Sequence, residues 1–418
     1  MGTIIDGKAI AEKNNEVTAA RVRNLIKNGH ARPKLVVIQA GNDPASSTYV
    51  RNKKIACEKV GILCEDIHID EEKDPAVTER RIIGEIHKAN RDDNINGILV
   101  QLPLPKGVDE ETVLNYINSF KDVDGFGYLN AGKLFSKKDP EPFGFIPCTP
   151  AGIVHMLNSI SVPYGINFAG KNAVIIGRSN IVGKPVSILL QRMNMNVTML
   201  HSKTSDEDKQ FYCRHADVIV VATGHENTLT DRHFYGDKKP IVIDVGIHRG
   251  EDGMLHGDVS EEVKAKYSSY YSPVPGGVGP LTVSMLLRNV AIAAERSYLM
   301  FSKTRKENEE NKKGGEEFMD REKQIEEMAK ITCSMYCRNK EKKCANVQEC
   351  DMKCSHHQRC EALYNAGYRK QNMGEWIMVR EGITEKVVCS NCNSEKGSFM
   401  KPPFCNQCGA IMKGGSEW

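Results

Sequence analysis

The sequence predicts a two-lobed α/β protein that is followed by a small cysteine-rich module. Two series of short, nearly all-apolar segments alternate with helical segments, as in parallel sheets covered by helices. Ten of the 14 cysteines lie between Cys333 and Cys408, so the last part of the chain differs in composition from the rest. The 418 residues allow two to four domains at roughly 100–200 residues each.

Composition excludes several classes of protein. With 40% hydrophobic and 27% charged residues, the chain can form a core, and global disorder is excluded. We expect no membrane partner, because no run of about 18 apolar residues occurs. The N-terminus lacks the pattern of a signal peptide, which predicts a cytoplasmic protein. Residues 301–418 carry 21 basic and 18 acidic side chains, and the preceding residues carry 36 of each, so charge alone does not indicate a nucleic-acid partner.

The first series of elements occupies the first hundred residues. An apolar run rich in β-branched residues, Lys34–Gln39, ends at the turn sequence Gly41-Asn-Asp-Pro44. The elements expected after it are a helix over 46–60, a strand over 62–69, a helix over 75–89 and a strand over 95–101.

A second series begins at Lys171. Its expected strands are short and almost wholly apolar, as buried parallel strands are. They cover residues 172–176, 196–200, 217–221 and 241–245. A helix over 281–295 follows Pro280, because proline is favoured at the start of a helix.

The first strand of this second series leads into a glycine turn. The turn, Gly177-Arg-Ser-Asn-Ile-Val-Gly183, precedes a helix expected from Val186. Such a unit presents backbone N–H groups and a helix N-terminus to a phosphate. The spacing departs from G-x-G-x-x-G, so the glycines could instead serve only to turn the chain.

The end of the next strand bears on the choice of dinucleotide. NAD-binding proteins usually place an acidic residue there for the ribose 2′-hydroxyl. Here the strand is followed by Ser202 and Lys203, and the first acid is Asp206. Ser202 and Lys203, with Arg178 as a bidentate partner, suit a 2′-phosphate and favour NADP. Lys203 could also be a solvated charge.

Several further residues stand where α/β sites form. Tyr49 and Lys53 are four residues apart on the helix after Gly41, so they share a face. Gln101 ends a strand, and Asp124 lies in a turn. The loop Pro273–Thr282 is rich in glycine and proline, which lets backbone approach a flat ligand closely, although it could also be an ordinary interdomain linker.

Together these segments closely resemble the bifunctional methylenetetrahydrofolate dehydrogenase/methenyltetrahydrofolate cyclohydrolase family over roughly residues 2–300. The motifs occur in the family's order. They are Tyr49-Val-Arg-Asn-Lys53, Val100-Gln-Leu-Pro-Leu-Pro105, Asp122-Val-Asp-Gly125, Pro147-Cys-Thr-Pro150, Gly177-Arg-Ser-Asn-Ile-Val-Gly183, His201-Ser-Lys-Thr204 and Pro273–Thr282.

The resemblance implies two reactions of one-carbon metabolism in one cleft. NADP⁺ takes a hydride from 5,10-methylenetetrahydrofolate, and water then converts the methenyl product to 10-formyltetrahydrofolate. Lys53 is implied as the acid/base group, Gln101 as its hydrogen-bond partner, Tyr49 as the residue that packs on folate and Asp124 as the one that binds the pterin edge. The other implied residues are Gly177, Arg178, Ser179, Gly183, Ser202, Thr149 and Ile247 for NADP, and Pro275, Gly276, Gly277 and Thr282 for the substrate.

The resemblance also implies a domain plan. A folate-binding catalytic domain covers 1–146 and is completed by helix 281–301, and a Rossmann-like NADP domain covers 147–280. The NADP domain is expected to form a homodimer. We expect a charged linker or helix over 302–330 and a cysteine-rich module over 331–418.

In this module, Cys389-x₂-Cys392 and Cys405-x₂-Cys408 are separated by twelve residues, a spacing typical of a zinc ribbon with four thiolate ligands. A disulfide or idle thiols are the alternative. A second cluster, from Cys333 to Cys360, matches no site that can be named. Nucleic acid is not the expected partner, but the module could instead act in regulation or nucleic-acid binding while the folate lobe only senses ligand.

The join between the two parts suggests an origin for the module. Residues 312–319, Lys-Lys-Gly-Gly-Glu-Glu-Phe-Met, can be encoded by a purine-rich stretch upstream of a start codon. We therefore hypothesise that 319–418 is a fused neighbouring reading frame. Gene sequence across these codons tests this, because synonymous codons that cannot form the purine-rich stretch would contradict it.

Overall fold

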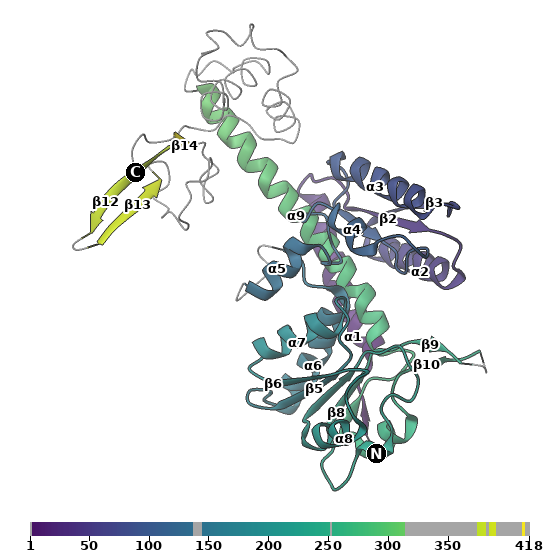
Figure 1. The fold of residues 1–418 in the computed structure, drawn as a ribbon. Coiled ribbons are helices and arrows are strands. Elements are labelled where there is room, and N and C mark those ends of the chain that lie inside the picture. The colour runs from purple at the N-terminus through teal and green to yellow at the C-terminus, as the bar shows by residue number, and fades with distance from the viewer. Residues whose placement is uncertain are drawn as a thin grey trace, which may run out of the picture. The chain divides into compact units, whose positions relative to one another are not determined.

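The structure is a computed structural model that describes residues 2–136, 144–250, 253–313, 374–381, 384–389 and 412–413. The chain divides into two compact units, Met1–Lys306 and Glu307–Trp418. The first unit contains both expected lobes (Figure 1). The described part of the chain contains no helix with the length and apolar character of a membrane span.

The first lobe is built on a three-stranded parallel sheet in the order β3-β2-β4. Alternate residues of the central strand β2 enter different cores, because side chains of a strand point to opposite faces. Leu35 and Val37 pack in the core that includes α1 and α2, whereas Val36 and Ile38 pack in the core that includes α3. The elements of this lobe are α1 (Gly7–Lys27), β2 (Lys34–Ala40), α2 (Pro44–Val60), β3 (Leu63–Ile69), α3 (Pro75–Arg91), β4 (Gly97–Val100), α4 (Glu110–Asn115) and α5 (Tyr128–Ser136).

Local capping explains where α2 and α3 begin. Asp43 and Asp74 stand before the two helices, and each side chain accepts a hydrogen bond from a backbone N–H of the first turn. A proline occupies the first helical position in both, where no N–H is needed. Helix α2 ends at Gly61, which has φ of 87°. Because the caps fix where α2 begins, its two candidate site residues, Tyr49 and Lys53, lie in its second and third turns.

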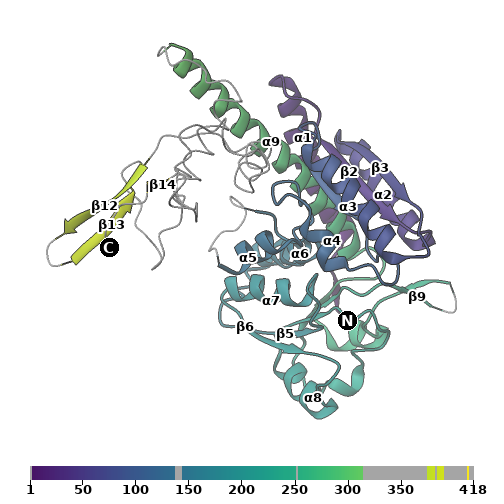
Figure 2. The same ribbon diagram turned by 45° about the horizontal axis from the view of Figure 1, so that its top comes forward.

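The second lobe is a six-stranded parallel sheet in the order β1-β11-β8-β7-β5-β6. Its central strands β5, β7 and β8 are almost wholly apolar, as expected, and helices cover both faces (Figure 2). The elements are α6 (Cys148–Tyr164), β5 (Asn172–Ile176), α7 (Gly183–Arg192), β6 (Asn196–Leu200), α8 (Asp206–His215), β7 (Val218–Val221), a 3₁₀ turn (Asp231–His233), β8 (Ile241–Asp244), β9 (His248–Arg249), β10 (Leu255–His256), a π-helical turn (Val263–Tyr267) and β11 (Tyr270–Tyr271).

The two ends of the first unit tie the lobes together. Strand β1 (Thr3–Ile4) adds the start of the chain to the edge of the second sheet. Helix α9 (Val278–Lys313) returns to the first lobe, where Ser284 accepts a hydrogen bond from Asn14 at 2.6 Å and Glu295 pairs with Arg21 at 3.3 Å. Helix α9 also begins before the expected 281 and continues into the charged segment as far as Lys313.

Beyond the end of α9 at Lys313, the second unit is described only through three strands. β12 (Gly374–Glu381) and β13 (Thr384–Cys389) form an antiparallel hairpin in which Trp376 faces Cys389. β14 (Met412–Lys413) pairs in parallel with the start of β12. The part of the expected linker or helix from 314 to 330 and the cysteines from Cys333 to Cys360 lie outside the described residues.

Candidate functional site

The amine of Lys53 is held by a directed hydrogen bond. Its Nζ donates to Gln101 Oε1 at 2.8 Å, and Gln101 Nε2 donates to the carbonyl of Leu102 at 2.6 Å. The second bond orients the Gln101 amide so that its oxygen faces Lys53. A neutral amine still carries N–H donors, so Gln101 holds Lys53 in either protonation state.

The electrostatics around Lys53 favour an uncharged amine. Burial lowers the pKa of Lys53, and the attraction of Asp124 partly opposes this shift. Burial likewise raises the pKa of Asp124, which Lys53 partly offsets. Two groups of opposite charge therefore share a poorly solvated place, and both shift toward their neutral forms. A lysine with a lowered pKa is a better candidate for an acid/base group than an exposed, fully charged one.

A buried carboxylate builds the turn that presents Asp124. Asp122 is 1% exposed, and its oxygens accept from the backbone of Gly125 at 3.0 Å and Gly127 at 2.9 Å and from Asn130 Nδ2 at 2.8 Å. Asp122 is thus structural, while Asp124 in the same motif interacts with Lys53. The sequence analysis named Asp124 as the site residue and gave Asp122 no role, so the support of the turn by Asp122 is what it missed.

Tyr49 lies one turn before Lys53 on α2 and is 44% exposed. Its ring is therefore free to cover a flat ligand placed beside the Lys53 amine.

The start of the second lobe is fastened to the Asp124 turn by residues that sequence reasoning missed. Cys148 Sγ donates to Val123 O at 3.4 Å, and Asn289 of α9 donates to Val123 O at 2.8 Å and Ile146 O at 3.3 Å. The neighbouring Thr149 shares a 3.0 Å hydrogen bond with Thr282. The family resemblance implies Thr149 for NADP and Thr282 for the substrate, and the two side chains lie next to each other.

The glycine-rich loop packs closely against the start of α1. Lys8 N donates to Gly276 O at 3.0 Å, and a Cβ on Gly7 would lie 1.9 Å from Gly277 O. Pro275, Gly276 and Gly277 therefore hold a fixed path. Ile247, 36% exposed, lies at this loop, because a Cβ on Gly279 would lie 3.4 Å from its Cδ1.

The turn after β5 is a tight glycine cradle. A Cβ on Gly177 would lie 2.3 Å from Ala222 O, and a Cβ on Gly183 would lie 2.3 Å from Gly177 O. Helix α7 begins at Gly183, three residues before the expected Val186. Ser179 Oγ accepts from the N–H groups of Val182 at 3.2 Å and Gly183 at 3.3 Å, so this hydroxyl supports the helix start as well as facing solvent.

Arg178 and Ser202 lie at the ends of neighbouring strands. Gly177 N donates to Leu200 O at 2.9 Å, which joins the exits of β5 and β6. Arg178, Ser202 and Lys203 are all exposed. A ligand that binds at both strand ends needs exposed side chains there, and these three residues provide them. The absence of a side chain at Gly177 also leaves the backbone accessible to a dinucleotide.

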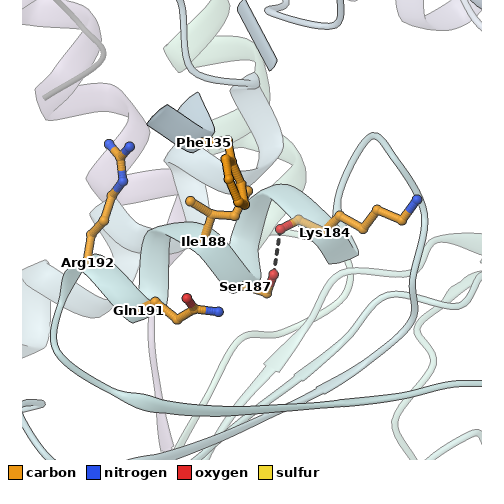
Figure 3. A pocket seen from close by; sticks show the side chains of 6 residues that line it. All are labelled: Phe135, Lys184, Ser187, Ile188, Gln191 and Arg192. Atoms are coloured by element: carbon orange, nitrogen blue, oxygen red, sulfur yellow. Dashed lines mark hydrogen bonds between the residues drawn. The ribbon is translucent and has the colours of Figure 1, made fainter. Parts of the chain in front are cut away.

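Other features of the described residues do not coincide with this site. A surface pocket of about 540 Å³ lies beside α7 (Figure 3); it is lined by Phe135, Lys184, Ser187, Ile188, Gln191 and Arg192. The described ranges contain no cluster of three metal-binding side chains. Of the four expected zinc ligands, Cys389 ends β13, and Cys392, Cys405 and Cys408 lie outside the described residues.

Comparisons with known proteins agree over the first unit. The tetrahydrofolate dehydrogenase/cyclohydrolase catalytic domain matches residues 5–124, and the NAD(P)-binding domain of the same name matches residues 147–298. The bifunctional protein FolD of Staphylococcus epidermidis is 45% identical over 290 residues, which are 69% of this chain and 96% of that protein.

Solved structures are similar over the same part of the chain. That of the FolD enzyme of Campylobacter jejuni, a methylenetetrahydrofolate dehydrogenase/cyclohydrolase, has a TM-score of 0.64 and 41% identity, covering 71% of this chain and 99% of that one. The Trypanosoma brucei enzyme, complexed with NADP cofactor and inhibitor, has a TM-score of 0.64 and 32% identity, covering 71% and 98%.

Proposed function

Because the chain belongs to the tetrahydrofolate dehydrogenase/cyclohydrolase family, we propose that its two lobes oxidise 5,10-methylenetetrahydrofolate with NADP⁺ and hydrolyse the methenyl product to 10-formyltetrahydrofolate. The observation that carries this proposal is the Lys53 amine. It is bonded to Gln101, interacts with Asp124 and has a pKa lowered by burial. An exposed, fully charged lysine would not support the hydrolytic step.

In the hydrolysis, neutral Lys53 accepts a proton from the water that attacks the methenyl carbon. The C–O bond forms, and the electron pair of the C=N bond returns to nitrogen. Lys53 then gives its proton to N5 as the C–N5 bond breaks. The hydroxyl group formed from the water releases its remaining proton to solvent as its C–O bond becomes C=O, which leaves the formyl group on N10. The cationic substrate disfavours a charged amine beside it and so keeps Lys53 available as a base.

Two other side chains orient the folate in this proposal. The exposed ring of Tyr49 stacks on the substrate one helical turn from Lys53. Asp124 accepts hydrogen bonds from the N–H groups of the pterin. The loop at Pro275, Gly276 and Gly277, with Thr282, is proposed as a further part of the substrate site.

The glycine cradle supports binding of the dinucleotide in the second lobe. Gly177 and Gly183 leave room for backbone N–H groups to approach the pyrophosphate, and Ser179 supports the helix start. Thr149 and Ile247 are proposed to border the nicotinamide, which is supported by the hydrogen bond of Thr149 to Thr282 and by the place of Ile247 beside Gly279. When bound, NADP⁺ accepts the hydride, and the protein residues hold and orient it.

The preference for NADP over NAD is proposed to come from Arg178 and Ser202. We expect Arg178→Ala to raise the KM for NADP⁺ by roughly 10- to 100-fold, since a charge-assisted hydrogen bond to phosphate contributes about 1.5–3 kcal/mol. The KM for NAD⁺, which has no 2′-phosphate, should stay within about twofold by the same reasoning. Absorbance of methenyltetrahydrofolate, followed with each cofactor, measures both. Equal effects on the two cofactors would contradict the assignment.

The reaction itself is tested on the full chain. Methylenetetrahydrofolate and NADP⁺ should give methenyltetrahydrofolate, and added methenyltetrahydrofolate should disappear faster than without enzyme. Absence of both activities would overturn the proposed function. This result would favour the alternative in which the folate lobe only senses ligand for a regulatory C-terminal module.

We also propose a structural Zn²⁺ site at Cys389, Cys392, Cys405 and Cys408 and a homodimer through the second lobe. The paired C-x₂-C spacing and the hairpin that ends at Cys389 support the site. Native mass spectrometry should give two chains and two zinc ions per particle, and Cys392→Ser should lose the zinc while both activities remain. A zinc-free chain would contradict the metal site, and a monomer would contradict the dimer.

A further inference from the structure

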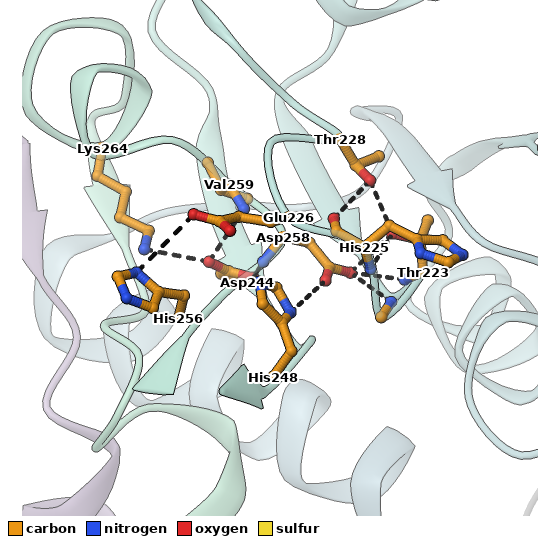
Figure 4. A network of polar contacts seen from close by, with 11 residues as sticks. Thr223, His225, Glu226, Thr228, Asp244, His248, His256, Asp258, Val259 and Lys264 are labelled. Carbon is orange, nitrogen blue, oxygen red and sulfur yellow. Dashed lines mark hydrogen bonds and ion pairs between the residues drawn. The ribbon is translucent and has the colours of Figure 1, made fainter. Parts of the chain in front are cut away.

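A fully buried carboxylate connects two segments that border the dinucleotide cradle. Asp258 is 0% exposed. Its Oδ2 accepts three hydrogen bonds, from Thr223 N at 2.6 Å, Thr223 Oγ1 at 3.0 Å and Gly224 N at 3.0 Å (Figure 4). Three donors converging on one oxygen fix the turn after β7 more firmly than neutral partners would, because the acceptor is charged.

The other oxygen of Asp258 faces the segment after β8. Oδ1 lies 3.9 Å from Nδ1 of His248, the residue that follows Ile247. Gly246 makes this approach possible, since a Cβ there would lie 1.8 Å from Asp258 Oδ1. A single side chain is therefore placed between the turn at 223–224 and the segment at 246–248.

A second buried carboxylate holds Asp258 in position. Asp244 accepts from the backbone of Asp258 at 2.8 Å and Val259 at 3.2 Å, and Lys264 Nζ lies 3.1 Å from Asp244 Oδ2. Both side chains of this ion pair are almost inaccessible. The backbone of Asp258 is thus held by a buried carboxylate that is itself paired with Lys264.

The turn that Asp258 holds forms one wall of the Gly177 cradle. Ala222 N donates to Ile176 O at 2.8 Å, and Ala222 O is the atom that a Cβ on Gly177 would meet at 2.3 Å. Thr223 comes directly after Ala222. A shift of the 223–224 turn would therefore move Ala222 away from Gly177. The backbone path at Gly177, against which the dinucleotide is proposed to bind, would change with it.

We propose that Asp258 is a positioning residue for the dehydrogenase reaction, and that it sets NADP⁺ affinity by fixing the 223–224 turn against Gly177. This inference rests on the proposed function. It assigns no contact between Asp258 and the reacting atoms, and it requires no effect on hydrolysis, because Lys53, Gln101 and Asp124 stand in the first lobe.

The test is Asp258→Asn in the full chain. Loss of the charged acceptor should raise the KM for NADP⁺ about 10-fold or more, as expected when hydrogen bonds to a charged group are weakened. The cyclohydrolase rate, which does not need NADP⁺, should stay within about twofold of the parent. The matched control is Asp217→Asn at the opposite end of the same sheet, where Asp217 also accepts from a backbone N–H, that of Asn172 at 2.8 Å. It should leave both activities unchanged.

A second pair of variants decides the result if Asp258→Asn lowers both activities through misfolding. Thr223→Val removes the hydroxyl that donates to Asp258, and Thr223→Ser keeps it. We expect the KM for NADP⁺ to rise about threefold or more in the valine variant and to return toward the parent value in the serine variant. A parent-like KM in a folded Asp258→Asn, or equal KM values for Val and Ser, overturns the inference. Lack of NADP⁺-dependent oxidation in the parent would instead overturn the proposed function.

Discussion

Lys53→Met should reduce the hydrolysis of methenyltetrahydrofolate by about 10²–10⁴-fold, which is the usual contribution of general acid–base catalysis. Methionine keeps the length and apolar stem of lysine but can neither accept nor donate the proton. Folate should still bind, because Tyr49 and Asp124 remain. The measurement is the decay of methenyltetrahydrofolate absorbance, corrected for spontaneous hydrolysis, together with a binding titration of the folate.

The neighbouring lysine provides a matched control. Lys54 is exposed and pairs with Asp66 at 2.9 Å, so Lys54→Met removes the same charge from the same helix without touching Gln101. It should hydrolyse the substrate at the parent rate. Normal hydrolysis by Lys53→Met would show that the amine is not the acid/base group.

The pH dependence follows from the direction of the pKa shift. Burial lowers the pKa of Lys53, and the base form is the neutral amine, so hydrolysis should rise with pH through a midpoint below the ordinary lysine value of 10.5. This limb should be absent from the residual activity of Lys53→Met. The free energy of unfolding should also rise with pH, because a lysine whose pKa is lowered by folding binds its proton more tightly in the unfolded chain. The native state therefore loses stability as pH falls from the ordinary lysine value of 10.5 toward the folded-state pKa, where only the unfolded chain binds the proton, and the loss is constant at lower pH.

The core of the fold was predictable because its signals are local. The buried parallel strands are continuous apolar runs, and the expected bounds of β5 and β6 agree with the structure. Helix α1 was missed because polar residues interrupt its apolar spacing, and α6 because it carries an internal proline, Pro163. The two-residue strands β1 and β11 are too short for any pattern.

The site was only partly predictable, for a different reason. Local spacing placed Tyr49 and Lys53 on one face, but Asn289 reaches Val123 across 166 positions of sequence. No periodicity encodes such a contact. The same holds for Asp258, which meets Thr223 through a return of the chain. At the site, long-range polar contacts were thus what the sequence analysis missed.

Gly177→Ala should abolish NADP⁺-dependent oxidation while hydrolysis continues. The new Cβ would lie 2.3 Å from Ala222 O, a backbone atom that cannot rotate away, and Gly177 has a φ of 133° that alanine rarely adopts. To relieve this clash, the backbone at residue 177 and Ala222 must move apart. The backbone surface that is proposed to bind the dinucleotide is then lost. We expect the KM for NADP⁺ to rise about 100-fold or more, equivalent to about 2.7 kcal/mol of lost binding.

Gly170→Ala separates backbone strain from the steric clash. Gly170 lies just before β5 with φ of 76°, but no atom stands within 4 Å of a Cβ built there. Its substitution therefore introduces unfavourable φ without blocking the cradle, and its KM for NADP⁺ should match that of the parent even if its melting temperature falls. A Gly177→Ala enzyme with normal NADP⁺ kinetics would show that the dinucleotide does not lie against this turn. Loss of both activities in that variant would show instead that the clash spreads into the first lobe, which the separate sheets of the two lobes argue against.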